Sequence, residues 1–188
     1  MLKLTIALVF ALTASAQTEV AVHLHNTAGV PAGEVKEAMR IAGRLFEPVG
    51  VTLRWKTCEA GCEAEAGVPT YVLGLAGAAV EMPLPGALGF SMLATGKVNR
   101  GAVSLPRVST FAEANSVPMA AVLAYSIAHE LGHMITRSKA HSNGVMKAKW
   151  DRENALRMGQ SRLDFAWVDV AAMKAALVAD VKDVSKAE

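Results

Sequence analysis

Short apolar segments bounded by turn residues dominate the first half of the chain and predict a β-sheet. In the first of these segments Val20, Val22 and Leu24 lie on one face, as in a half-buried strand. The expected strands are Val20–His25, Val51–Trp55, Thr70–Leu75, Leu88–Leu93 and Ala102–Leu105, with a turn at Thr95–Gly101. Between the first two strands, apolar residues at helical spacing predict a helix from Ala32 to Glu47.

The segment from Val117 to Ile135 is apolar on nearly every side, and Glu130 is its only charged residue. A helix of this composition is expected to be buried. Ser116 is the expected N-cap, and Pro118 is expected in the first turn, where a missing N–H costs nothing. One stripe of the helix consists of large apolar residues at helical spacing: Leu123, Ile127, Leu131 and Met134.

Helical spacing returns near the C-terminus. A short helix from Arg152 to Met158, closed by Gly159, and an amphipathic helix from about Asp164 to Val181 are expected. The elements then follow in the order strand, helix, four strands, helix, loop and helices. This order predicts an α/β (α+β) sandwich.

The N-terminus has the composition of a secretory signal. Lys3 supplies the positive start, an apolar run covers Leu4–Leu12, and Ala14–Ala16 matches the small-residue cleavage pattern. We therefore expect residues 1–16 to be removed after Ala16 and the protein to be secreted or periplasmic. The alternative, an uncleaved membrane anchor, is disfavoured because the run is too short to span a bilayer comfortably. Residues 17–188 show no repeat or long linker and suit a single domain.

Charge limits the kind of partner. The chain has 19 basic and 17 acidic residues, and the signal removes only Lys3, so the mature protein is nearly neutral. Without a basic run, nucleic-acid binding is not supported. No later stretch is long and apolar enough for a membrane span, so we expect no span in the mature chain. We also expect the mature protein to be a monomer.

Chemically active side chains gather in the buried helix, as His129-Glu130-Leu131-Gly132-His133. Two histidines four apart lie one turn apart on the same helix face, so both imidazoles can bind one metal ion, here expected to be Zn²⁺. The glutamate between them is then placed to take a proton from a zinc-bound water. The alternative is a pair of hydrogen-bonded core histidines, which would leave a carboxylate and two imidazoles buried at high cost.

Two residues compete for the place of third ligand. His141 lies eight residues after His133 and would complete a three-histidine site with a fourth position open for water, which is the mark of a catalytic zinc. Glu153 lies twenty residues after His133, where thermolysin-like zincins carry a glutamate ligand. Glu153 also falls at a predicted helix start, where a carboxylate ordinarily interacts with the helix dipole. We therefore favour His141.

Cys58 and Cys62 are the two cysteines of the chain. A close pair in an exported protein predicts a disulfide, and closing so short a loop contributes only about 2 kcal/mol in the chain-entropy treatment. A structural zinc at this place would need two further ligands, and no further cysteine exists, so zinc is not expected there. His23 and His25 share the polar face of the first strand and are expected to be solvated rather than metal-bound.

From His129 to Met146 the chain resembles the metzincins, a clan of secreted zinc endopeptidases. Metzincins carry the two-histidine helix with its glutamate, a turning glycine, a third zinc-binding histidine, and a methionine in a tight turn beneath the metal. The resemblance implies that His129, His133 and His141 are zinc ligands, that Glu130 is the general base, and that Met146 is the turn methionine. The other interpretation of Met146 is an ordinary core methionine.

The loop between the second and third histidines departs from the clan pattern. Lys139 holds the usual position of the third histidine, and His141 follows two residues later, so the loop is lengthened. Thr136 stands at the usual turning glycine, so the chain must turn in another way, because a non-glycine residue at positive φ costs about 1 kcal/mol or more. Ser142, directly after His141, resembles the matrixin branch of the clan. Over residues 17–188 the resemblance implies a twisted mixed sheet with a buried active-site helix and a C-terminal helical part.

The resemblance implies a secreted zinc endopeptidase in which Glu130 activates a zinc-bound water to cut a peptide or protein substrate. Such a substrate would pair with the strand Leu88–Leu93 through backbone hydrogen bonds. Two other functions fit the same residues: a secreted zinc hydrolase of a non-peptide amide, and a catalytically silent zinc-binding module. Glu130 disfavours the silent module, because metal binding alone needs no carboxylate at this position.

Overall fold

The structure is a computed structural model that describes residues 17–59, 62, 65, 67–78, 82–93 and 98–184, the last four of them without their side chains. The expected signal segment, residues 1–16, and residues 95–97 of the expected turn at Thr95–Gly101 lie outside the described residues.

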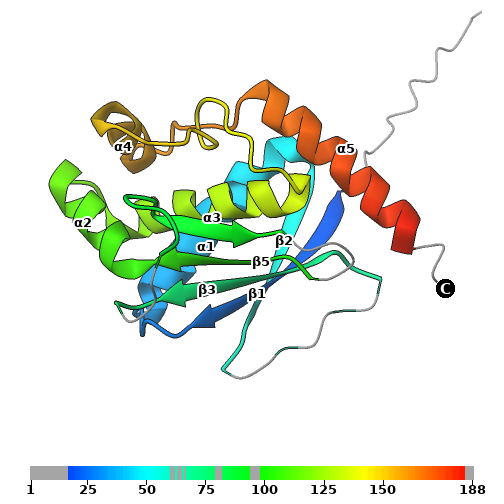
Figure 1. Cartoon of the computed structure of the whole chain (residues 1–188), viewed down its shortest axis with the longest axis horizontal. Coiled ribbons are helices and arrows are strands. Elements are labelled where there is room, and N and C mark those ends of the chain that lie inside the picture. The colour runs from blue at the N-terminus through cyan, green and yellow to red at the C-terminus, as the bar shows by residue number, and fades with distance from the viewer. Residues whose placement is uncertain are drawn as a thin grey trace, which may run out of the picture.

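Within the described part of the chain, five strands form one mixed sheet in the order β2-β1-β3-β5-β4 (Figure 1). The strands are β1 (Thr18–Asn26), β2 (Val51–Thr57), β3 (Thr70–Ala76), β4 (Gly89–Met92) and β5 (Arg100–Ser104). β1 is parallel to β2 and β3, and β3 is parallel to β5, whereas the edge strand β4 is antiparallel to β5. Each strand occupies an expected segment, and its ends differ from the expected ones by no more than two residues.

Helices pack on the sheet and on one another. They are α1 (Ala32–Phe46), the 3₁₀ turn η1 (Glu47–Val49), α2 (Leu105–Asn115), α3 (Met119–Thr136), α4 (Arg152–Gly159) and α5 (Trp167–Val184). The inward face of β1, with Val20, Val22 and Leu24, is completely buried in a core that α1 and α3 complete. No helix in the described part of the chain is both long and apolar enough to cross a membrane.

α3 lies at the centre of the molecule (Figure 1). From Ala120 to Ile135 every residue is buried except His129, which is half-buried. α3 contacts α1, β3, β4 and β5, and it also contacts α4 and α5 from the C-terminal part. The α/β fold with a buried motif helix is therefore confirmed.

The start of α3 differs from the expected one because a helix that the pattern did not predict precedes it. α2 ends at Ser116, which takes the left-handed conformation (φ 55°) as its C-cap, so Ser116 is not the N-cap of α3. Pro118 is that N-cap, and no side chain caps the helix. α2 was missed because it buries only Val108 and Ala112, which form no extended apolar stripe. The available signal was a proline in its first turn.

Gly159 also has a different role from the expected one. α4 continues through Gly159 to a C-cap at Gln160. A Cβ at position 159 would lie 3.2 Å from a methyl carbon of Val117, so glycine allows the end of α4 to approach the segment that leads into α3.

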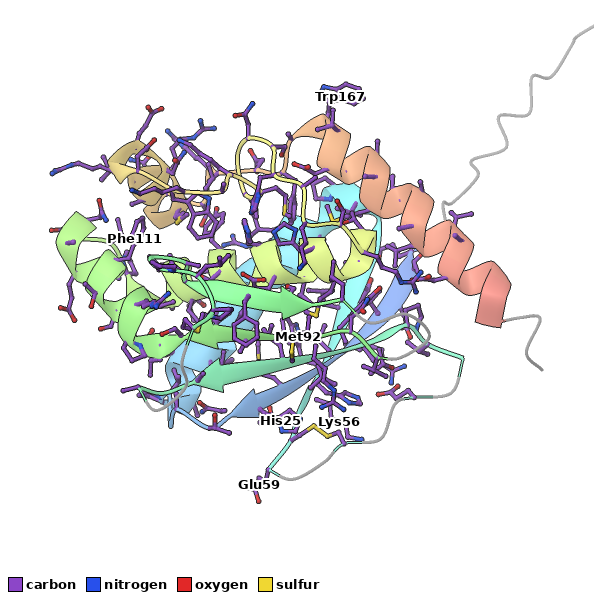
Figure 2. All side chains as sticks on the ribbon, in the orientation of Figure 1. His25, Lys56, Glu59, Met92, Phe111 and Trp167 are labelled. Carbon is purple, nitrogen blue, oxygen red and sulfur yellow. A yellow bond between two sulfur atoms is a disulfide. The ribbon has the colours of Figure 1, made fainter. Side chains whose placement is uncertain are left out.

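The outer face of β1 is not solvated as expected. His23 has no exposed surface and His25 is half-buried, and Cys58, Cys62 and Glu65, which follow β2, lie near His23 on this face of the sheet. A disulfide joins Cys58 and Cys62, and the Cys58 N–H donates to Leu24 O at 2.9 Å. Figure 2 shows His25 close to this disulfide, away from α3 and α4.

Candidate metal centre

The structure brings the three candidate ligands together at the exposed end of the buried helix. The ring centroids of His129 and His133 are 4.6 Å apart, and their Nε2 atoms are 3.0 Å apart. The ring of His141, from the segment after α3, lies 5.4 Å from that of His129 and 4.8 Å from that of His133. One ligand atom from each residue lies within 4.8 Å of the other two.

Backbone carbonyls fix the tautomers of the two helix histidines. His129 Nδ1 lies 2.8 Å from Val145 O, and His133 Nδ1 lies 2.7 Å from Ser138 O. A carbonyl oxygen only accepts, so in the neutral rings each Nδ1 carries the hydrogen and each Nε2 keeps its lone pair. Two lone pairs 3.0 Å apart repel one another unless a cation lies between them. Two nitrogen ligands of a tetrahedral zinc are about 3.3 Å apart, so the residues fit this metal.

Burial keeps the helix imidazoles in the form that binds a metal. It lowers the pKa of His129 to about 4 and also lowers the pKa of His133. Both rings are therefore neutral at neutral pH, so no proton has to leave before a metal binds. His141 is exposed, which places the open side of the group towards solvent.

The lengthened loop before His141 turns at Arg137. Thr136 stays helical, and Arg137 takes the left-handed conformation (φ 49°) as the C-cap of α3, donating its N–H to His133 O. Arg137 then pairs with Asp180 of α5 at 2.7 Å, an interaction that helps offset the cost of its φ. At the other end of the loop Ser142 Oγ donates to Asp169 of α5 at 2.5 Å. α5 therefore holds both ends of the segment that carries His141.

Met146 lies in a turn against α3. The turn passes through Gly144 at φ 64°, and Ser142 N–H donates to Met146 O at 3.1 Å. Met146 is buried, and a Cβ at Gly132 would lie 2.6 Å from its sulfur. The methionine thus packs on the helix position directly before His133, which is compatible with the turn methionine that the resemblance implies.

Glu130 points to the edge strand β4. Its side chain is 4 % exposed, and burial raises its pKa to about 7, although a hydrogen bond from Ser91 acts in the opposite direction. Ser91 Oγ donates to Glu130 Oε2 at 2.5 Å. A Cβ at Gly89 would lie 2.6 Å from Glu130 Oε1, so only glycine leaves room for the carboxylate. Sequence reasoning missed both Gly89 and Ser91, because no spacing rule links a strand to a helix so far along the chain.

Glu153, the rival third ligand, is not brought to the histidines. It is exposed in the first turn of α4, whose N-cap is Asp151. Trp150, just before that cap, does reach the site: its ring meets that of His129 edge to face, with the centroids 5.5 Å apart.

Comparison with known proteins places the fold. No protein-family model matches the chain, and no curated protein matches it. Among solved structures, archaemetzincin from Methanopyrus kandleri superposes with a TM-score of 0.56, covering 89% of this chain and 99% of that chain at 15% sequence identity. The fold is metzincin-like. In this metzincin-like fold α3 is the central helix, β4 the sheet edge beside it, and α4 and α5 the C-terminal helical part.

Proposed function

We propose that this chain is a secreted, zinc-dependent endopeptidase. The observation that carries the proposal is the pair of Nε2 atoms of His129 and His133, which face one another at 3.0 Å while both Nδ1 atoms bond to carbonyl oxygens. His141 would supply the third nitrogen. Three neutral imidazoles with an open fourth position are typical of a catalytic zinc. The metzincin-like fold supports this proposal.

When bound, zinc would polarise the scissile carbonyl, lower the pKa of the attacking water and stabilise the oxyanion that forms. Glu130 takes a proton from the attacking water and delivers it to the leaving amine. Burial raises the pKa of Glu130 to about 7 in the metal-free protein, and a bound zinc would lower it towards the carboxylate form that accepts the proton. Ser91 fixes the orientation of the carboxylate through its hydrogen bond to Oε2.

The edge strand β4 supports a peptide substrate over a small amide. Leu88 O accepts from Ser104 N at 2.7 Å, so the alternation of an antiparallel pair turns the backbone groups of Gly89 and Ser91 to the open edge. An extended peptide can add to this edge as a further strand. Its backbone would then lie next to Glu130, which is packed against Gly89 and Ser91.

The decisive experiment compares zinc-loaded residues 17–188 with the Glu130→Gln variant on a broad peptide library. The variant keeps shape and polarity but cannot take a proton, so it should retain zinc and lose cleavage by about two to four orders of magnitude. If the library stays uncut while a small amide is turned over in a Glu130-dependent way, the protein is an amide hydrolase. Zinc binding without either activity would identify a silent module.

Secretion, a monomeric state and membership of the matrixin-like branch are proposed from the sequence alone. Export is proposed on the composition of residues 1–16, and the exported protein should begin at Gln17 and be monomeric. Intact-mass analysis that finds Met1 retained would contradict the processing. The matrixin-like branch is proposed on Ser142 alone, and the archaemetzincin neighbour does not support this finer assignment.

A further inference from the structure

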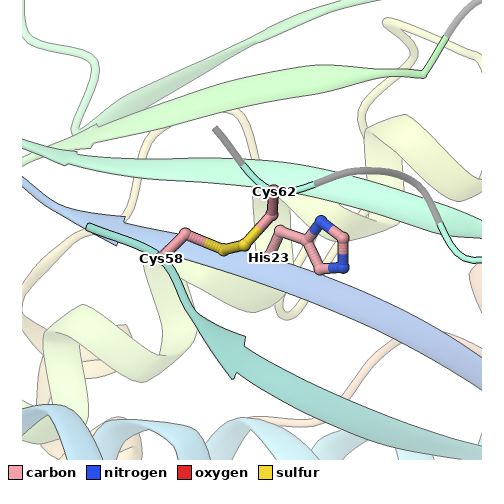
Figure 3. A group of neighbouring side chains, drawn as sticks. All are labelled: His23, Cys58 and Cys62. Carbon is pink, nitrogen blue, oxygen red and sulfur yellow. A yellow bond between two sulfur atoms is a disulfide. The ribbon is translucent and has the colours of Figure 1, made fainter. Parts of the chain in front are cut away.

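A second group of metal-ligating side chains lies on the outer face of the sheet. Figure 3 shows the ring of His23, on β1, beside Cys58 and Cys62 from the segment after β2. One ligand atom of each lies within 4.8 Å of the other two. Among the described residues, this group and the three-histidine group are the two places where three or more such side chains come together.

His23 is the unusual member of the group. It has no exposed surface, and neither ring nitrogen has a hydrogen-bond partner among the described residues. Buried polar groups are nearly always bonded, and an unbonded one destabilises the fold. The nearest charged group is Glu65, whose Oε1 lies 3.8 Å from His23 Nε2, too far for a hydrogen bond. A ligand between these side chains would satisfy the imidazole.

We propose that Cys58 and Cys62, when reduced, bind a zinc ion together with His23, and that Glu65 supplies the fourth ligand. Two sulfurs, one nitrogen and one oxygen form a tetrahedral donor set that zinc accepts. The carboxylate favours zinc over Cu(I), which selects sulfur ligands. The cysteines are four residues apart, within the range of zinc-binding pairs.

Contacts other than the disulfide hold two of the proposed ligands, Cys58 and Glu65, in place. The backbone of Cys58 is bonded to β1 through Leu24 O at 2.9 Å. Glu65 pairs with Arg54 of β2 through Oε2, which leaves Oε1 directed to His23. The Glu65 N–H also donates to Thr70 Oγ1 at 3.3 Å. The closed loop is short, so opening the disulfide frees little chain entropy.

Disulfide and zinc exclude one another at this site. A dithiol reductant gives two electrons and two protons to the Cys58–Cys62 bond, which becomes two thiols while the reductant becomes a disulfide. Zinc then displaces the two thiol protons to solvent. Oxidation by a disulfide-forming partner reverses both steps and releases the metal. The site is therefore redox-gated, with zinc held only in the reduced chain.

Cobalt titration of residues 17–188 tests the proposal, because a thiolate bound to Co²⁺ gives a charge-transfer band that imidazole ligands do not. The reduced protein should bind one Co²⁺ more per chain than the oxidised protein and should show this band. His23→Gln and Cys62→Ser should lose both the extra ion and the band. His25→Gln, on the same face of β1, is the matched control and should keep both.

The half-exposed Glu65 offers a variant that does not disturb a buried position. Glu65→Gln should weaken the extra site at least tenfold while thermal unfolding shows a folded chain. No extra ion on reduction, or a thiolate band that persists in a folded His23→Gln variant, would overturn the zinc site. An unchanged affinity of this site for Co²⁺ in Glu65→Gln would show that Glu65 is not the fourth ligand.

Discussion

Ser91 Oγ donates a hydrogen bond to Oε2 of Glu130 across 2.5 Å and so joins the edge strand β4 to the buried helix α3. The strand proposed to pair with substrate thus also holds the proposed general base. A displacement of β4 would move the carboxylate and the substrate edge together.

Removal of this hydroxyl should slow catalysis without affecting metal binding. Hydrogen bonds to charged groups contribute about 1.5–3 kcal/mol, so Ser91→Ala should lower kcat about tenfold or more while KM and zinc content stay unchanged. Ser91→Thr keeps a hydroxyl and should restore most of the rate. Steady-state kinetics on one peptide substrate measure both constants. A rise in KM at constant kcat would instead make Ser91 a substrate-binding residue.

The third ligand can be tested by two alanine substitutions. His141→Ala should weaken zinc affinity strongly, because it removes one of three imidazoles that meet within 4.8 Å. Glu153→Ala should have little effect, since Glu153 is exposed on α4 outside this group. Competition with a chromogenic chelator gives both affinities. The reverse order would place the protein with the thermolysin-like zincins.

The metal-free protein should carry a pH dependence that comes from Glu130. Burial raises the pKa of Glu130 from 4.5 to about 7, so between these values the folded state binds more protons than the unfolded state. The stability of the wild type should therefore fall, relative to Glu130→Gln, as the pH rises through this window. The relative change is at most about 3 kcal/mol. The comparison with Glu130→Gln isolates the contribution of this one carboxyl group.

Urea unfolding in the presence of a chelator, at a series of pH values, measures the difference between Glu130→Gln and the wild type. The difference should be constant below pH 4.5 and again above about pH 7. A difference that does not change between these limits would show that Glu130 is not buried in the metal-free protein.

The contact between Gly132 and Met146 allows a double-mutant test of the methionine turn. A Cβ at position 132 would lie 2.6 Å from the buried sulfur, so Gly132→Ala should destabilise the protein by about 1–3 kcal/mol. In a Met146→Ala background the same change should be neutral or stabilising by up to about 1 kcal/mol, because alanine favours the helix. Equal effects in both backgrounds would rule out this packing.

The features that sequence alone predicted are those set by local periodicity. A spacing of four residues was enough to place His129 and His133 on one helix face, and their rings do lie side by side. The apolar composition around Glu130 predicted the burial of α3, which the structure confirms. The strand segments followed from short apolar runs, but their order in the sheet is a tertiary property that no run of residues specifies.

The features that were missed depend on contacts between distant segments. His23 is buried beside Cys58, Cys62 and Glu65, which follow β2 in the chain, and the polar character of that face of β1 does not reveal these neighbours. The hydrogen bond of Ser91 to Glu130 joins residues 39 positions apart. The sequence showed that no glycine was available for the turn after α3, but only the structure shows that Arg137 makes it and that Asp180 pairs with it.

The two contacts between α5 and the loop of His141 set a lower limit on the length of a fragment that can bind metal through all three histidines. Arg137 pairs with Asp180 and Ser142 bonds to Asp169, so the far C-terminal helix holds the loop that brings the third imidazole to the other two. Trimming the protein before residue 180 would leave His129 and His133 in place on α3 but would free one end of that loop. The shortest fragment worth expressing for metal-binding work therefore extends past Asp180, although no residue of α5 belongs to the three-histidine group itself.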